Sequence, residues 1–124
     1  MSYQVFLVEY LGVPLNHHAI FVETTPENGT GYIFQVIGNI QNGMEYENKV
    51  GYRPEESQSF VSKSFLGSVD AVNYGRIGEI CSSIPPPKKQ FQGSRRLYPG
   101  EPLRRCHEWT QDAIAELSNA GVLQ

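Results

Sequence analysis

Segments in the first half of the chain carry the spacing of apolar residues that is typical of β-strands. They are rich in β-branched and aromatic residues and cover residues 3–10, 17–24, 32–38 and, more briefly, 44–46. Turn residues separate them, among them Gly12-Val13-Pro14 and Asn42-Gly43. The second and third segments, joined by a short loop with glycines, are expected to form a β-hairpin. A weaker alternation over residues 57–65 predicts a further strand.

The hydrophobic period changes after this point. From residue 68 to residue 84 the apolar positions share one helical face, and Pro85-Pro86-Pro87 must end that helix because proline has no N–H and a fixed φ. Residues 90–98 predict one more strand. Residues 105–119 predict the strongest helix, whose apolar stripe consists of Trp109, Ala113, Ile114 and Leu117. We therefore expect one α+β domain over residues 1–124, an antiparallel sheet of about five strands with helices on one side.

Charge and cysteine content narrow the class of protein. The net charge is −3, which argues against a general nucleic-acid binder, although six of the ten Lys and Arg residues fall between positions 88 and 105. We interpret this basic stretch as a solvated surface. There is no apolar leader-like start and no run of 18 apolar residues, so we expect a cytoplasmic protein without a transmembrane segment. Two cysteines do not make a disulfide framework and are expected to be reduced.

The strongest candidate for chemistry is Cys106, at the predicted start of the last helix. Unpaired N–H groups and the helix dipole favour an anion there, and Arg104 and Arg105 add positive charge, so the pKa of the thiol is expected to fall. The alternative interpretation, a thiol that only packs at a helix start, is equally compatible with the residues. Cys81 lies on the apolar face of its helix and is expected in the core.

A nucleophilic thiol needs a base, and the chain has three histidines. His107 follows Cys106 directly and would point about 100° away from it on a helix. His17 and His18 lie on an early strand that could reach Cys106, and only one of them can face the helix. Composition alone would place a His-His pair at a solvated strand end.

Three short motifs resemble the permuted papain-like cysteine superfamily, which includes lecithin:retinol acyltransferase, the H-Ras-like suppressor acyltransferases and the PPPDE peptidases. The segment His17-His18-Ala19-Ile20-Phe21 resembles the histidine strand of that superfamily, and residues 31–35 (GYIFQ) resemble the following strand. Residues 105–109 (RCHEW) resemble the N-C-E-H-F box that opens the cysteine helix, with Arg105 in place of the usual Asn.

The resemblance implies a circularly permuted papain-like fold in which Cys106 is the nucleophile, His17 the base and Gln35 the group that orients the base. It implies a hydrolase or acyltransferase that acts on an amide, ester or thioester of a protein, peptide or lipid, without a cofactor. Its register selects His17 over His18. Selectivity is expected in the loops around residues 54–59 and 90–99.

Two other classes of function stay open. Because Arg105 departs from the family pattern, a catalytically silent binding module of the same fold is the main alternative. A metal site of His17, His18, His107 and Cys106 is disfavoured, because adjacent strand residues diverge and no C-x-x-C or H-x-x-x-H spacing exists. Substrate and oligomeric state cannot be assigned from the sequence.

Overall fold

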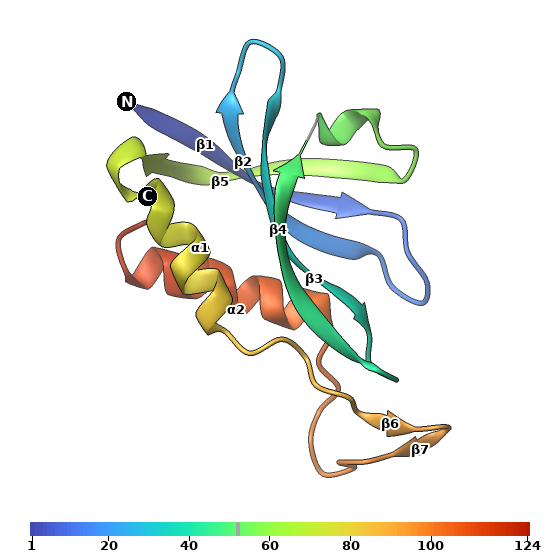
Figure 1. The fold of residues 1–124 in the computed structure, drawn as a ribbon. Helices are drawn as coiled ribbons and strands as arrows, with labels where there is room; N and C mark the ends of the chain where they lie inside the picture. The colour runs from blue at the N-terminus through green and yellow to red at the C-terminus, as the bar shows by residue number, and fades with distance from the viewer. Residues whose placement is uncertain (52) are drawn as a thin grey trace.

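A computed structural model of the chain describes residues 1–51 and 53–124. Five antiparallel strands form one sheet in the order β4-β3-β2-β1-β5. Their bounds are β1 Ser2–Tyr10, β2 His17–Thr25, β3 Thr30–Asn39, β4 Gly43–Gly51 and β5 Phe60–Asp70. The predicted α+β class and the antiparallel sheet of about five strands are confirmed. Neighbouring strands in the sheet follow one another along the chain from β1 to β4, which requires only short turns between them (Figure 1).

Two helices complete the fold. They are α1 Tyr74–Ser83 and α2 Cys106–Asn119, and single 3-10 turns lie at Pro54–Glu56 and Ala71–Asn73. Both helices cover the same face of the sheet (Figure 1). Helix α1 ends at Ser83, with Ile84 between it and the proline triplet, and Gly121, with φ of +73°, lies just after α2.

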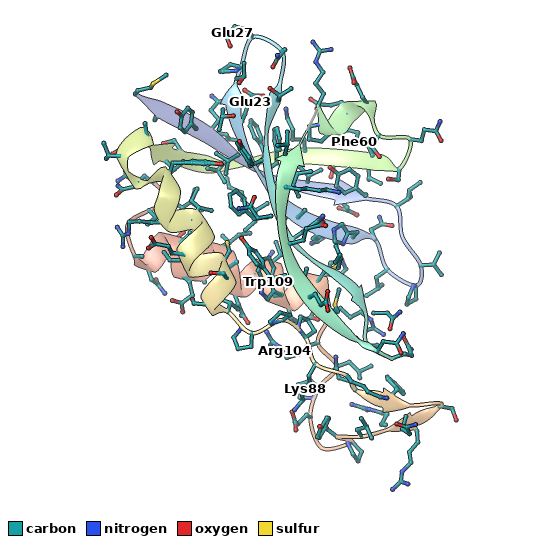
Figure 2. All side chains as sticks on the ribbon, viewed as in Figure 1. Glu23, Glu27, Phe60, Lys88, Arg104 and Trp109 are labelled. Atoms are coloured by element: carbon teal, nitrogen blue, oxygen red, sulfur yellow. The ribbon has the colours of Figure 1, made fainter. Side chains whose placement is uncertain are left out.

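Apolar residues on the two faces of the sheet form separate clusters. Between the sheet and the helices, Ile20, Phe34 and Val36 belong to one cluster with Cys81 and Trp109. Figure 2 shows Trp109 between α2 and the sheet. The indole N–H of Trp109 donates to the backbone oxygen of Ile84 at 3.2 Å, which joins α2 to the end of α1. On the other face a smaller cluster consists of Val8, Ala19, Phe21 and Ile33, with Phe6, Tyr10 and Phe60 at its edge. Cys81 is fully buried, as the sequence predicted.

The predicted helix over residues 68–84 was too long. Strand β5 continues to Asp70, and α1 begins only at Tyr74. Val69 is one of the apolar positions within the predicted helix, yet it is buried because it pairs with Tyr3 of β1 and faces the helices from the sheet. A single apolar residue ahead of a helix is compatible with both the helical and the strand period of hydrophobic residues. Here Val69 belongs to the strand, because β5 pairs with β1.

The predicted strand over residues 90–98 was also wrong. That segment is a small arm in which β6 Phe91–Gln92 pairs with β7 Arg95–Arg96, apart from the main sheet (Figure 1). Gln90 is buried at its base, where its side chain bonds both the N–H and the carbonyl oxygen of Arg104. The arm therefore leaves and rejoins the domain at one point, directly before α2.

Candidate active site

An opening between two neighbouring strands receives the start of α2. Strand β2 pairs with β3 from Ile20–Phe34 onward, and the first three residues of β2 have no β3 partner in the part of the chain described. Cys106 is the first residue of α2 and lies at this opening with 7% of its surface exposed. The backbone N–H groups of His18, Cys106 and His107 face its sulfur and favour the thiolate. Strand β2 thus contributes directly to the surroundings of the thiol.

Cys106 and His17 line the same cavity, of about 260 Å³. One wall is the loop that precedes β2, and the other is the turn between β3 and β4 together with Met44. His17 comes from the first position of β2, where β3 has already diverged. The structure therefore brings together a nucleophilic side chain and a basic side chain that lie 89 positions apart in the sequence.

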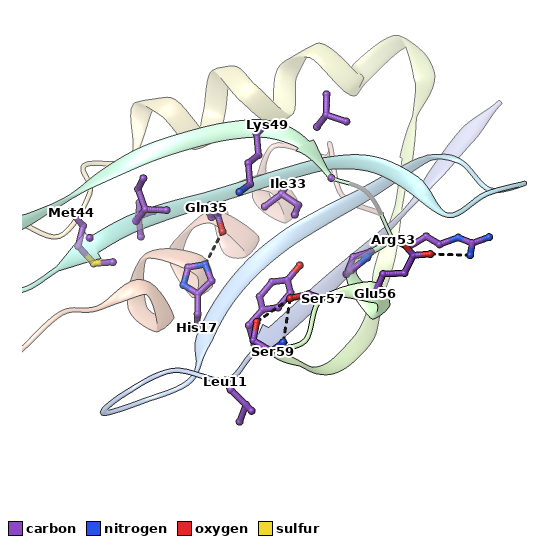
Figure 3. A pocket seen from close by; sticks show the side chains of 17 residues that line it. Leu11, His17, Ile33, Gln35, Met44, Lys49, Arg53, Glu56, Ser57 and Ser59 are labelled. Carbon is purple, nitrogen blue, oxygen red and sulfur yellow. Dashed lines mark hydrogen bonds and ion pairs between the residues drawn. The ribbon is translucent and has the colours of Figure 1, made fainter.

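His17 is held by a chain of two hydrogen bonds along the face of the sheet away from the helices. Figure 3 shows the first of them, between His17 and Gln35. Nε2 of His17 lies 2.7 Å from Oε1 of Gln35, and Nε2 of Gln35 donates to Oε2 of Glu47 at 2.6 Å. The ring of Tyr10 stacks against the imidazole with 6.2 Å between centroids. Since an amide carbonyl only accepts, His17 carries its proton on Nε2, and Nδ1 is left with a free lone pair.

The expectation that the pKa of Cys106 falls was wrong. Burial raises the pKa of this thiol, the three backbone N–H groups oppose that effect, and the Glu108 carboxylate adds to it. Neither Arg104 nor Arg105 is among the groups that shift the pKa of this thiol. The guanidinium of Arg104 pairs instead with Asp112. Burial also raises the pKa of Cys81, to about 12, and that thiol is inert core.

His18, and not His17, occupies the helix-facing side of β2, so the residue that the sequence selected as the base faces the other side of the sheet. The ring of His18 packs on that of His107, with centroids 3.9 Å apart, and its Nε2 lies 3.7 Å from a carboxylate oxygen of Glu9. Burial and the neighbouring His107 lower the pKa of His18. His107 Nε2 bonds the backbone oxygen of Asn16 at 2.6 Å, which ties α2 to the loop before β2. These two rings join α2 to β2. Of the two, His107 lines the cavity of about 260 Å³, and His18 does not.

A larger hollow of about 670 Å³ adjoins His17 on the open face of the sheet (Figure 3). Tyr10, Leu11 and Ile33 give it apolar surface, and Lys49 and the turn from Pro54 to Ser59 border it. His17 and Gln35 line it, so the imidazole lies between the two cavities. Of the two loops expected to govern selectivity, residues 54–59 border this hollow, whereas residues 90–99 contribute to a separate groove beside the proline triplet.

Glu47 is the residue at this site that the sequence interpretation missed. The Asn42-Gly43 pair did not reveal it: a two-residue turn there would place residue 50 opposite residue 35, whereas the observed hairpin turns over residues 40–42 and places residue 47 there. The short strand predicted at residues 44–46 stopped one residue before it, while β4 extends to Gly51.

Two searches of the described residues found nothing. No cluster of three or more His, Cys, Asp or Glu side chains there could hold a metal ion. No helix within residues 1–51 and 53–124 is long and apolar enough to cross a membrane.

Comparison with known proteins identifies a family. Searches of curated proteins and of solved structures gave no match. One family model, DUF6540, described as a family of unknown function, matches residues 5–124. Since this match covers nearly the whole chain, the protein belongs to the DUF6540 family.

Proposed function

We propose that the protein is a cysteine hydrolase or acyltransferase with a circularly permuted papain-like arrangement, in which Cys106 is the nucleophile and His17 the base. One observation carries the proposal: Cys106 lines the same cavity as His17, whose Nε2 is held by Gln35. Nucleophile, base and orienting group are the three parts that covalent acyl transfer requires. The order along the chain, with the histidine strand before the cysteine helix, matches the permuted arrangement.

The reaction proceeds in two steps. Nδ1 of His17 takes the thiol proton while Sγ of Cys106 bonds the carbonyl carbon of an amide, ester or thioester. The bond to the leaving group then breaks, and the leaving group takes that proton from His17. Water attacks the resulting thioester in a hydrolase, and an acceptor hydroxyl or amine does so in a transferase. The attacking group gives its proton to His17, and His17 passes it to the sulfur of Cys106 as the thioester bond breaks.

The first turn of α2 suits the charge that develops in this reaction. Backbone N–H groups of Cys106 and His107 have no partner within the helix at these positions and face the sulfur. They are placed to donate to the oxyanion of the tetrahedral intermediate, and losing one such donor costs roughly 100-fold or more in rate. The hollow beside His17 is the space we assign to the substrate.

Trapping of the acyl-enzyme tests the proposal. We expect p-nitrophenyl acetate to acetylate Cys106 in the wild-type protein, with the acetyl group located by peptide mass spectrometry, and Cys81 to serve as the internal control. Cys106→Ala should lose the adduct and stay folded, because it removes one sulfur from the edge of the core. Acetylation that persists in Cys106→Ala would show that the nucleophile is another group.

A catalytically silent binding module of the same fold is the second candidate. The raised pKa of Cys106 and its 7% exposure favour it, because a buried neutral thiol is a poor nucleophile. Equal and slow acetylation of Cys106 and Cys81 would support this candidate against the first.

A further inference from the structure

We propose that Glu47 is the positioning residue that keeps His17 in the tautomer needed for catalysis. It would act through Gln35 and would touch neither the substrate nor Cys106. This inference rests on the proposed function, since it assigns a task at the same site.

The argument begins with the pairing of β3 and β4. Gln35 and Glu47 lie directly opposite each other, so their side chains are neighbours on one face of the sheet. The Gln35 amide spans the gap between Glu47 and His17, with contacts of 2.6 Å and 2.7 Å. Both contacts are short, and they use opposite ends of the same amide.

An amide by itself does not determine which end faces the imidazole. It carries two donors on nitrogen and an acceptor on oxygen, and a half-turn exchanges them. A carboxylate only accepts, so Glu47 requires the amide nitrogen on its side and leaves the amide oxygen for His17. Glu47 therefore selects one of two orientations that Gln35 could otherwise adopt.

The selected orientation decides the chemistry of His17. With the amide oxygen at Nε2, that nitrogen holds the proton and Nδ1 can accept one from Cys106. With the amide reversed, its N–H would donate to Nε2, the ring proton would move to Nδ1, and the base would have no lone pair for the thiol. A wrong tautomer is a severe defect in catalytic triads.

The surroundings of Glu47 fit a specific task better than general surface charge. Its side chain is one-third exposed, and Lys49 Nζ lies 3.8 Å away, longer than either amide contact. Glu45 lies two residues earlier on the same face of β4 but is exposed, opposite Ile37. Glu45 therefore provides a matched control for the loss of one negative charge.

The test measures the His17 tautomer and the reactivity of Cys106 in Glu47→Gln. A glutamine at position 47 can donate as well as accept, so Gln35 is no longer forced into one orientation. We expect ¹⁵N NMR to show a rise in the Nδ1–H tautomer of His17, and the rate of Cys106 acetylation by p-nitrophenyl acetate to fall roughly 10- to 100-fold. Glu45→Gln should change neither. Glu47→Lys, which offers only donors, should shift the tautomer further.

The outcomes separate this inference from the proposed function. An unchanged tautomer in both Glu47 variants would overturn the positioning role, whatever the acetylation rate does. A changed tautomer supports that role even without turnover, because the spectrum reports on the imidazole alone. If His17→Ala leaves the acetylation of Cys106 unchanged, the proposed function fails.

Discussion

Two opposing influences act on Cys106. Burial raises the pKa of its thiol, while three backbone N–H groups stabilise the thiolate. Because burial prevails, the thiol is neutral at rest, and it becomes a strong nucleophile only when a base removes its proton. In the proposed reaction that base is His17, and this is why the orientation of its imidazole would matter.

His18 leads to a prediction about stability in acid. Burial lowers its pKa most, and the positive charges of His107 and His17 lower it further. The carboxylates of Glu9 and Glu108 oppose this effect. Below the histidine pKa of the unfolded chain, about 6.5, the unfolded state binds more protons at this position than the folded state. The free energy of unfolding therefore decreases as the pH falls through this range.

We expect urea unfolding to show a smaller loss of stability on acidification in His18→Phe than in wild type. Identical losses in the two proteins would mean that His18 does not link folding to protons.

Part of the site could be predicted from residue patterns alone. Cys106 at a helix start, His17 at a strand start and Gln35 on the next strand follow from short motifs, and the structure gathers them. The direction of the Cys106 pKa could not be predicted, because it depends on how closely the loop before β2 and the turn after β3 cover the sulfur. Glu47 could not be predicted either, because the hairpin turns over residues 40–42, and a two-residue turn at Asn42-Gly43 would have placed residue 50 opposite Gln35.

At the level of elements, the site depends on where β2 and β3 pair and where they separate. They are in close contact at Gly31, where a Cβ would stand 1.9 Å from the backbone oxygen of Val22. At the other end the pairing stops at Ile20–Phe34, and the opening there admits α2. The close approach at one end and the end of the pairing at the other leave His17 in the unpaired part of β2, which lines a cavity with Cys106.

A pair of glycine substitutions tests this close approach. Gly31→Ala should destabilise the protein by about 2 kcal/mol, because the clash is with backbone that cannot move aside cheaply. Gly75→Ala, in the first turn of α1, meets nothing within 4 Å and should stabilise it by about 0.5–1 kcal/mol. Denaturant unfolding compares the two. A neutral Gly31→Ala would contradict the close contact between β2 and β3.

The elements themselves were largely predictable, and their boundaries were less so. Alternating apolar residues located β1, β2 and β3 to within a few residues, and the Trp109 stripe located α2. The boundary between β5 and α1 was misplaced because Val69 is buried by pairing with β1, a contact far away in sequence. The β6–β7 arm was taken for a strand because Gln90 and Arg104 close it through side-chain bonds that periodicity does not reveal.

In the whole molecule, antiparallel order turns a scattered set of residues into one site. Successive hairpins place residues 17, 35 and 47 side by side across β2, β3 and β4. The chain then crosses to β5, passes through α1 and the arm, and returns along α2, so that Cys106 reaches the end of the sheet where His17 lies. Each of these short sequence motifs is weak evidence for a site by itself, and the strand order of the sheet brings them to the same end of the molecule.

The most direct test of this account is the pH dependence of Cys106 alkylation by iodoacetamide in the wild type, His17→Ala and His18→Ala. If His17 is the base, Cys106 in the wild type should react near neutral pH at least about tenfold faster than in His17→Ala. The pH profile of His17→Ala should shift to the alkaline side, toward the raised pKa that burial imposes, while His18→Ala stays close to the wild type. Equal rates in the wild type and His17→Ala would contradict the pairing of Cys106 with His17, and a larger loss in His18→Ala would transfer the role of base to the other face of β2.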